Sequence, residues 1–309
     1  MRPLILSCMM LTAMSAGLLA DGPARKVLII GIDGCRPDAL AAAKTPQLDK
    51  LIERGTYCVD TQILADRETP GDTVSGPGWS NILTGVWPDK HGVIDNSFKG
   101  SNYAAYPHFF ARLKAGWPEA VTASFTTWMP IQEKILSHAD VGRNFPDPAP
   151  KNLVEYVSGD RDATTACVEY ITKQDPTAVM LYLGQVDETG HKFGFHPKVP
   201  QYVSAIETVD AHIGDVMTAI EQRPSLAKES WLIIVCTDHG GVGLNHGGGR
   251  KTPEIRDVYL IISGPAAKQG RHEEPTSQVD VVATALTHLG VELNPAWKLD
   301  GKAVGLKDR

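Results

Sequence analysis

The stretch KVLIIGID, from Lys26 to Asp33, decides the fold because an uninterrupted apolar run ends there at a carboxylate. Two more apolar runs end near an aspartate: residues 178–184 precede Asp187, and residues 231–236 precede Asp238. Apolar runs of this length are typical of strands buried in a parallel sheet. Because ligands of open α/β sheets bind at the carboxyl ends of the strands, we expect the three aspartates at one edge of one sheet.

Histidines accompany two of these aspartates. His191 follows Asp187 by one helical turn, His239 directly follows Asp238, and His246 lies in a glycine-rich stretch just beyond. An aspartate at the end of a strand is, taken alone, more often a helix cap or a turn former than a ligand. With the aspartate of the first run, however, the set contains three carboxylates and three imidazoles. Such a set matches two metal sites of the nitrogen and oxygen kind that zinc favours, so the sequence predicts two divalent metal ions, with zinc the best match.

The rest of the chain alternates strand-like with helix-like segments. This alternation predicts one α/β domain over residues 21–309, with a mostly parallel sheet covered by helices on both faces. We expect further strands at 57–64, 121–125 and 258–262, and helices between Thr45 and Gly55 and at 79–83, 107–114, 163–173, 200–222 and 279–289. Residues 94–152 include polar, proline-punctuated parts without a clear parallel-sheet rhythm, and we expect them to form a small cap insert over the site.

Composition limits the class of partner. The chain has 309 residues, a formal net charge of −6 and a pI near 5.9, which leaves no basic field for nucleic acid or an anionic membrane. Residues 1–20 combine Arg2, an apolar stretch and small residues, so we expect a signal peptide, export to the periplasm or outside the cell, and no membrane contact after cleavage. After the signal peptide the chain has four cysteines, Cys35, Cys58, Cys167 and Cys236, and no CxxC pair. We expect apolar surroundings for Cys58, Cys167 and Cys236.

A candidate nucleophile precedes the short helix expected at 79–83. Ser75 would lie at or just before the N-terminus of that helix, where backbone amides favour developing anions. A metal ion bound to the hydroxyl would lower its pKa and make it reactive at neutral pH. Thr73 and Ser80 are competing hydroxyls, and a purely capping role for Ser75 is the alternative.

The chain resembles the alkaline phosphatase superfamily and, within it, the branch of type I phosphodiesterases and nucleotide pyrophosphatases. The resemblance covers nearly the whole chain after the signal peptide and is specific because the motifs occur in order. The matching motifs are Gly31 to Asp38, Thr45 to Asp49, Ser75 to Gly85, Trp87 to Gly92, Asp187 to His191, Thr237 to Gly241 and His246 to Gly248.

The resemblance implies a division of the ligands and a core fold like that of alkaline phosphatase. One metal would be held by Asp33, Asp238, His239 and Ser75, and the other by Asp187, His191 and His246. Ser75 matches the family's nucleophile, which is threonine in many relatives. Those relatives carry a phosphate-binding asparagine three residues later, where this chain has Gly78. Candidates for the missing group are a backbone amide, the indole of Trp79 and Asn81.

These inferences combine into a functional hypothesis. The chain is expected to be an exported two-metal hydrolase of small phosphate esters, with phosphodiesters or nucleotide-like substrates favoured, that acts through Ser75 and a covalent phospho-enzyme. One alternative is a phosphomonoesterase or a sulfatase-type esterase on the same fold. The sulfatase motif ends in an arginine, and Trp79 stands in its place. Another alternative is a catalytically silent binding protein, which would be favoured if Ser75 or a ligand were missing; all are present.

Overall fold

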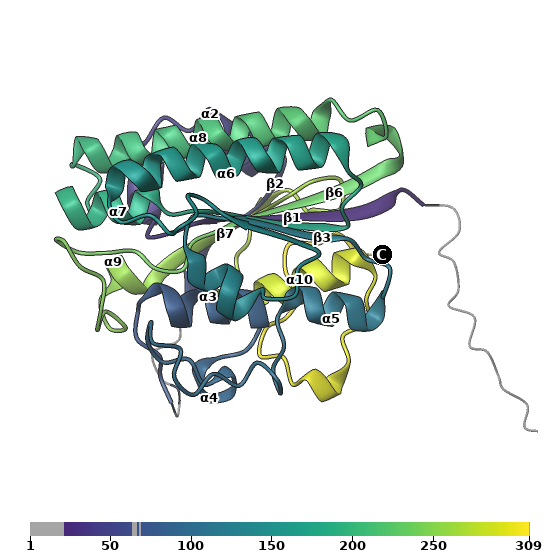
Figure 1. Ribbon diagram of the computed structural model, residues 1–309, viewed down its shortest axis with the longest axis horizontal. Coiled ribbons are helices and arrows are strands. Elements are labelled where there is room, and N and C mark those ends of the chain that lie inside the picture. The colour runs from purple at the N-terminus through teal and green to yellow at the C-terminus, as the bar shows by residue number, and fades with distance from the viewer. Residues whose placement is uncertain (1–21, 64–66, 68, 309) are drawn as a thin grey trace, which may run out of the picture.

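Helices cover both faces of one mixed sheet in the computed structural model, which describes residues 22–63, 67 and 69–308 (Figure 1). One layer contains α1, α2, α6, α7 and α8, and the opposite layer contains α3, α4, α5 and α10. This arrangement confirms the predicted α/β fold class. The expected signal peptide, residues 1–20, lies outside the described residues.

The sheet is parallel at its centre and antiparallel toward one side. β1 pairs in parallel with β5 and β6, and β3 pairs in parallel with β4 and β5. β7 pairs antiparallel with both β6 and β2. In sheet order the strands are β4 (Val141–Asn144), β3 (Thr122–Thr126), β5 (Ala178–Leu183), β1 (Ala24–Ile32), β6 (Glu229–Cys236), β7 (Asp257–Ser263), β2 (Gly55–Gln62) and β8 (Gly270–Arg271), with β9 (Thr276–Ser277) paired to β2.

The helices connect these strands and bury them. α8 is the longest and contacts α6, α7, α2 and α1. The helices are α1 (Pro37–Ala42), α2 (Pro46–Glu53), α3 (Ser75–Thr84), α4 (Pro88–His91), α5 (Phe109–Gly116), α6 (Leu153–Lys173), α7 (Gln185–Phe193), α8 (Pro200–Glu221), α9 (Pro253–Arg256) and α10 (Asp280–Leu289), with short helical turns at Ile131–Ile135, Leu226–Lys228 and Pro295–Trp297.

The predicted elements are present, with shifted boundaries. α6 begins at Leu153, ten residues before the expected start at residue 163, because the side chain of Asn152 caps it by accepting the amides of Val154 and Glu155. α3 begins at Ser75 instead of residue 79, so the candidate nucleophile is the first residue of the helix. The expected strand 57–64 is β2, which begins at Gly55. Its last expected residue, 64, lies outside the described part of the chain.

Residues 94–152 contribute to the main layers of the fold. They contain α5 together with β3 and β4, and β3 is hydrogen-bonded to β5 in the central sheet. Asn96 and Trp128, from the same segment, line the pocket described below. A covering role for this segment as a cap insert stays a prediction.

The two large clusters of the described core lie on opposite faces of the sheet. Alternate side chains of β1 point to opposite faces, as the pleat of a strand requires. Leu28 and Ile30 belong to the cluster beneath α6 and α8, whereas Val27 and Ile29 belong to the cluster that includes residues of α3, α5 and α10. The four cysteines of the described chain are free and buried, as expected for small core residues. Among the described residues, none of the helices has the length and apolarity needed to cross a membrane.

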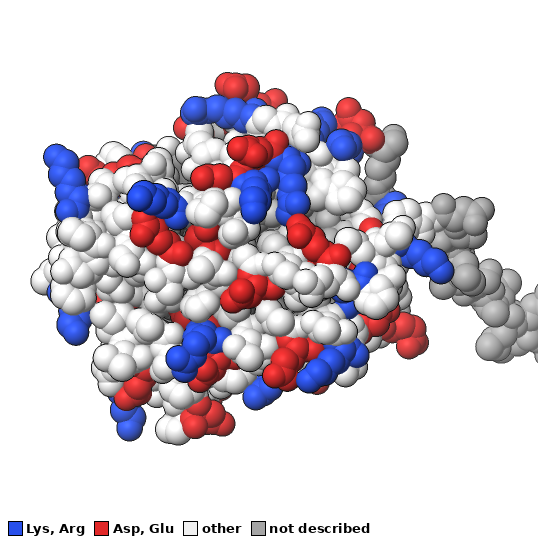
Figure 2. Space-filling model, turned by 90° about the horizontal axis from the view of Figure 1, so that it is seen from above, with Lys and Arg blue, Asp and Glu red and all other residues white. Residues whose placement is uncertain are grey.

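The surface over the α6 and α8 layer carries charges of both signs. Figure 2 shows Lys and Arg side chains interspersed with Asp and Glu side chains on this face. A mixed surface of this kind gives no single-sign field of the sort that attracts a nucleic acid. Figure 2 shows this face alone, so the absence of a nucleic-acid partner stays a prediction.

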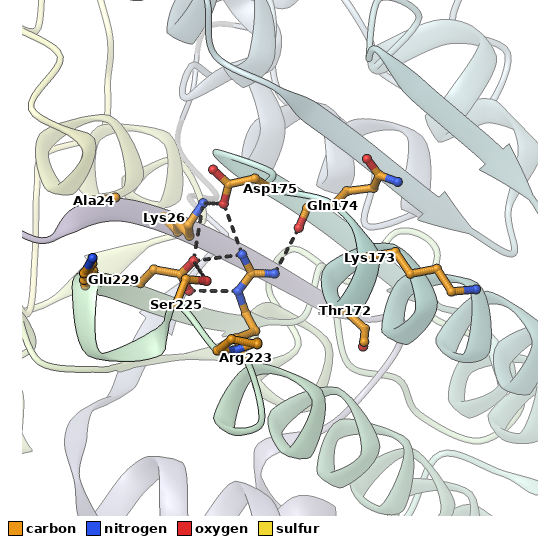
Figure 3. A pocket seen from close by; sticks show the side chains of 11 residues that line it. Ala24, Lys26, Thr172, Lys173, Gln174, Asp175, Arg223, Ser225 and Glu229 are labelled. Carbon is orange, nitrogen blue, oxygen red and sulfur yellow. Dashed lines mark hydrogen bonds and ion pairs between the residues drawn. The ribbon is translucent and has the colours of Figure 1, made fainter.

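A hollow of about 560 Å³ lies at the edge of the sheet where β1 and β6 begin (Figure 3). An ion-pair cluster of Lys26, Asp175, Arg223 and Glu229 lines it. Arg223 donates two bonds of 2.8 Å to the carboxylate of Glu229, and Lys26 and Arg223 both donate to Asp175, at 2.6 and 3.1 Å. Trp231 also donates to Glu229. The charged groups satisfy one another, so we interpret this cluster as structural.

We predict that Arg223→Ala lowers the free energy of unfolding by about 3 kcal/mol, because it leaves the buried Glu229 carboxylate without its bidentate partner. Urea denaturation at pH 7 measures this loss. Lys173→Ala is the matched control, since Lys173 lines the same hollow but is exposed and should change stability by less than about 0.5 kcal/mol. Equal losses in the two variants would contradict a structural role for the cluster.

The same cluster gives a prediction about pH. Burial raises the pKa of Glu229, but hydrogen bonds from Arg223, Trp231 and Ser225 outweigh it and lower the pKa to about 2. A carboxyl with a lowered folded-state pKa stabilises the protein above its unfolded pKa, and this stabilisation is lost as the pH falls toward 2. Glu229→Gln should therefore destabilise the protein strongly at pH 7 and progressively less between pH 4 and pH 2. A stability gap between wild type and variant that does not narrow with falling pH would contradict this.

Candidate active site

The first group of candidate ligands lies at the ends of two neighbouring strands. β1 and β6 are paired in parallel with Gly31 opposite Cys236, so Asp33 and Asp238 follow the strands at the same edge of the sheet. The Nε2 atom of His239 lies 3.5 Å from Oδ1 of Asp33 and 3.3 Å from Oδ2 of Asp238. All three side chains are buried.

The second group comes from α7 and from the loop after β6. Asp187 and His191 face each other across one turn of α7, with 3.3 Å between Oδ2 and Nε2. The loop brings in His246, whose Nε2 lies 3.0 Å from Nε2 of His191 and 3.5 Å from Oδ1 of Asp187. Gly34 allows the close approach of β1 to α7: it has φ +65°, and a Cβ atom there would lie 2.6 Å from Oδ1 of Asp187.

Each of the three histidines is oriented by a backbone carbonyl. The Nδ1 atoms of His191, His239 and His246 lie 2.9, 2.9 and 2.7 Å from the carbonyl oxygens of Leu244, Gly240 and Thr73. A carbonyl oxygen accepts only, so each Nδ1 must be the donor. The proton on Nδ1 leaves the Nε2 lone pair directed at the carboxylates, which is the tautomer that a metal ligand requires.

Two imidazoles of the cluster have pKa shifts of opposite sign. Burial, and next the charge of His239, lower the pKa of His246 to about 3. The hydrogen bond to Asp187 raises the pKa of His191 to about 9 against the opposing effect of burial. The two shifts have opposite signs because His191 pairs with a carboxylate, whereas the effect of burial dominates at His246.

Four buried polar atoms of this cluster lack hydrogen-bond partners among the described residues. Oδ1 of Asp33, Oδ1 of Asp187, Oδ2 of Asp238 and Nε2 of His239 are buried without a hydrogen bond in the described structure. Burial, followed by the charges of Asp33 and Asp187, raises the pKa of Asp238 well above its ordinary value. Converging carboxylates and imidazoles with unused lone pairs fit divalent cations, which would neutralise the carboxylates and complete their coordination.

The geometry allows two overlapping sets of possible ligands. One set is Asp33, Asp238 and His239, and the other is Asp187, His239 and His246; within each set the ligand atoms lie within 4.8 Å of one another. The rings of His239 and His246 stack with centroids 3.7 Å apart, so the two sets adjoin. All six ligands that the sequence suggested thus lie in one cluster, which can bind metal. How many ions it holds, and which side chains bind each, stay predictions.

A pocket of about 150 Å³ opens beside the second group of ligands. Ser75, the first residue of α3, lines it, so the predicted nucleophile and the metal-binding cluster share one space. The other lining residues are Asn96, Trp128, Tyr156, Tyr182, Gly184, Asp187, Glu188, His191 and His246. A hydroxyl at a helix N-terminus beside candidate cation ligands is suited to nucleophilic attack on an anionic ester.

The decisive comparison is with a known protein family. Residues 27–263 match the family described as type I phosphodiesterase / nucleotide pyrophosphatase. The chain belongs to this family. The match contains every predicted ligand and the predicted nucleophile, and it confirms the resemblance seen in the sequence motifs.

Individual family members and solved structures are distant. Ectonucleotide pyrophosphatase/phosphodiesterase family member 7 of Rattus norvegicus is 25% identical over 240 residues, which are 71% of this chain and 51% of that protein. An inactive murine ectonucleotide pyrophosphatase / phosphodiesterase 5 in complex with AMP superposes with a TM-score of 0.66 at 16% identity and covers 88% of this chain and 96% of that one. BT1596, a 2-O GAG sulfatase, gives a TM-score of 0.67 at 14% identity, with 92% and 73% covered.

These similarities support different conclusions about the chain. At 14 to 16% identity, the two solved structures show a shared fold of the alkaline phosphatase type, which phosphodiesterases and sulfatases have in common. The chain spans about half the length of the rat relative, so the relative's activity as a whole protein does not transfer directly. The family is assigned by the match over residues 27–263.

Two of the three suggested substrate-binding residues are held away from the pocket. The indole Nε1 of the fully buried Trp79 donates to Oδ2 of Asp33 at 2.8 Å. Asn81 donates to Gln278 and contacts Nε2 of His91 through its Oδ1 atom. Neither residue lines the pocket, and their polar atoms contact other side chains; a substrate-binding role for them stays a prediction.

The third suggested residue, Gly78, packs directly against a ligand. A Cβ atom at Gly78 would lie 2.7 Å from Cβ of Asp238, which is too close for any side chain without a shift of the helix or the strand end. The family's asparagine therefore does not fit at this position in the present arrangement. Glycine here lets the first turn of α3 approach Asp238.

Asn96 is the polar residue that the motifs did not reveal. Its Oδ1 accepts the backbone amide of Gly76 at 2.6 Å, which fixes the side chain next to Ser75, and the residue lines the pocket. With Oδ1 engaged, the amide NH₂ group remains available as a donor. Asn96 lies in the segment that was expected to cover the site, but no local pattern distinguishes it there from any other loop asparagine.

Proposed function

We propose that this protein is an exported two-metal hydrolase of phosphate esters that acts on phosphodiesters or nucleotide-like substrates through Ser75. The observation that carries this proposal is the shared pocket of Ser75 and a metal-compatible cluster of carboxylates and imidazoles. Membership of the type I phosphodiesterase / nucleotide pyrophosphatase family supports the reaction class. Export rests on the sequence of residues 1–20.

The metal ligands are proposed as the resemblance suggested. One ion would be held by Asp33, Asp238, His239 and Ser75. The other ion would be held by Asp187, His191 and His246. Bound divalent cations, most readily zinc, would lower the pKa of the serine hydroxyl and offset negative charge on the phosphoryl oxygens. The unpartnered atoms of Asp33, Asp187, Asp238 and His239 support this placement.

The side chains then divide the work of the reaction. The Oγ atom of Ser75 attacks phosphorus in line with the leaving oxygen, so that an Oγ–P bond forms as the ester P–O bond breaks, and the leaving group departs as an alcohol with the proton that the serine gives up. A water later attacks phosphorus, breaks the Oγ–P bond and returns a proton to Oγ. Asn96 holds a phosphoryl oxygen beside the helix N-terminus, where backbone dipoles also favour negative charge. Trp79 and Tyr182 fix the carboxylate of Asp33 through bonds of 2.8 and 2.6 Å to its Oδ2 atom.

The charge of the pocket favours a diester over a monoester. None of the described residues that line the pocket is a lysine or an arginine. Arg36, which stands in a matching motif, is engaged with Asp38 and with the carbonyls of Phe195 and Gly241. A dianionic monoester would therefore meet no cationic side chain, whereas the single charge of a diester needs less compensation.

The test is a panel of nitrophenyl esters on zinc-reconstituted protein. We expect the phosphodiester to be hydrolysed with the highest kcat/KM, above the phosphonate ester, the phosphate monoester and the sulfate ester. A preference for the monoester would support the phosphomonoesterase alternative, and activity on the sulfate alone would overturn the proposal. No turnover of any ester by metal-loaded protein would favour the silent binding protein.

Replacing Asn96 tests the assignment of the phosphate-binding group. Asn96→Ala should lower kcat for the best ester by about 10²-fold, the loss typical of one oxyanion donor, without loss of bound metal. Steady-state kinetics and metal analysis measure the two quantities. Ser97→Ala is the matched control, because Ser97 is exposed and bonds to Asp95 outside the pocket. If both variants keep full activity, a different group contacts the phosphate.

A further inference from the structure

Arg112 is buried in α5 without a partner. Its relative exposure is 1%, and its Nε, Nη1 and Nη2 atoms make no hydrogen bond in the described structure. Burial lowers the pKa of Arg112 to about 10, so the guanidinium still carries its charge at neutral pH. Its identified neighbour is the ring of Trp297, 5.4 Å from Cζ, whose face attracts a cation but cannot accept all the N–H groups.

The other two arginines that the structure describes as buried show how this fold treats such a charge. Arg36 bonds to Asp38 and to two backbone carbonyls. Arg223 bonds to Glu229, Asp175 and two further carbonyls, as Figure 3 shows for its carboxylate partners. Both guanidinium groups thus have at least four hydrogen bonds and are balanced by carboxylates. Arg112 departs from this pattern, and an unbalanced buried charge is strongly unfavourable unless something supplies the missing acceptors.

A second buried group without a partner lies one helical turn away. The backbone amide of Arg112 bonds to the carbonyl of His108 at 3.1 Å, and His108 is 4% exposed with neither ring nitrogen hydrogen-bonded. The ring of His108 stacks with that of His138 at a centroid distance of 6.3 Å. His138 is exposed, so this end of the cluster reaches solvent. Burial, and then the positive charges of His138 and Arg112, lower the pKa of His108 to about 4.

We propose that Arg112 and His108 bind a small monovalent inorganic anion of the chloride class. The donors exclude a metal ion, because a guanidinium has no lone pair to offer. A water molecule would accept some N–H groups but would leave the charge unbalanced. A monovalent anion neutralises the single charge of Arg112, whereas a divalent oxyanion would exchange one unbalanced buried charge for another.

The site is separate from the catalytic pocket. α5 lies under the sheet beside α10, on the side away from α7 (Figure 1), and neither Arg112 nor His108 lines the pocket of Ser75. The inference therefore does not depend on the proposed hydrolase activity. An anion at this place would tie α5 to the turn at Pro295–Trp297 and stabilise the packing between α5 and the C-terminal part of the chain.

Chloride-dependent stability tests the proposal. Metal-loaded protein is unfolded in urea at constant ionic strength while chloride replaces gluconate. For wild type we expect stability to rise with the logarithm of the chloride concentration above Kd, with the unfolding equilibrium constant about 100-fold lower at 100 times Kd. Arg112→Met keeps the aliphatic stem and should lose the chloride dependence. Arg161→Met, at an exposed position of α6, should behave like wild type.

Three outcomes would overturn the proposal. The first is a wild-type stability that does not change with chloride, and the second is an equal chloride dependence in Arg112→Met and wild type. The third is a chloride dependence that is lost in Asp238→Asn and kept in Arg112→Met, because that result would place chloride at the metal cluster. If Arg112→Met fails to fold, a crystal structure of wild type soaked in bromide tests the site instead. An anomalous peak within hydrogen-bonding distance of the Arg112 guanidinium supports the site, and density for water alone refutes it.

Discussion

Ser75→Ala is expected to lower kcat for phosphate ester hydrolysis by at least about 10⁴-fold. Without the nucleophile the covalent phospho-enzyme cannot form, so the groups that activate the serine no longer contribute to the rate. Metal content should stay intact, since the carboxylates and imidazoles that form the cluster remain. Single-turnover kinetics and metal analysis of the same samples measure both effects. Mass spectrometry of acid-quenched wild type should find the phosphoryl adduct on Ser75 and none in the variant.

The structure offers a matched control on the same helix. Ser80 is also a buried serine of α3, but its hydroxyl bonds to the carbonyl of Gly76 and to Tyr103, and it does not line the pocket. Ser80→Ala should therefore lower stability slightly and keep kcat within about threefold, as a change outside the reacting groups would. If Ser75→Ala retains activity and Ser80→Ala loses it, the nucleophile has been assigned to the wrong hydroxyl.

Removing metal should have the second large effect, on both activity and stability. Chelation is expected to abolish hydrolysis and to lower Tm, because the carboxylates of the cluster then face one another without a cation. Readdition of zinc at about 1,000 times Kd should recover roughly 4 kcal/mol of stability, which corresponds to a rise in Tm of at least about 5 °C. Differential scanning calorimetry with and without zinc measures the shift.

Asp238→Asn separates binding from folding in this experiment. Without metal the variant should be more stable than wild type, because it removes a buried charge whose pKa is raised by burial and by Asp33 and Asp187. With zinc it should gain far less stability than wild type. Asp162→Asn, an exposed position on α6, should follow wild type in both states. An equal zinc response in Asp238→Asn and wild type would remove Asp238 from the ligands.

The order of strands and helices could be predicted because each element leaves a local trace. The apolar runs before Asp33 and Asp238 are buried strands of the sheet, and helices occur where apolar spacing or a capping residue indicated them. Boundaries depend on weaker signals. The start of α6 is set by the cap at Asn152, and α3 starts at Ser75, within the range that the sequence allowed for that residue.

The sequence alone determined the chemical inventory of the site, because ligand types and strand ends are readable from residue order. It identified the six candidate ligands and placed Ser75 before a helix. Tertiary structure decided what those residues meet. In the folded chain, Trp79 donates a hydrogen bond to Asp33, Gly78 packs against Asp238, and Asn96 lies beside Ser75. Such contacts join segments far apart in the chain, and their geometry depends on packing between layers, which periodicity and motif spacing do not encode.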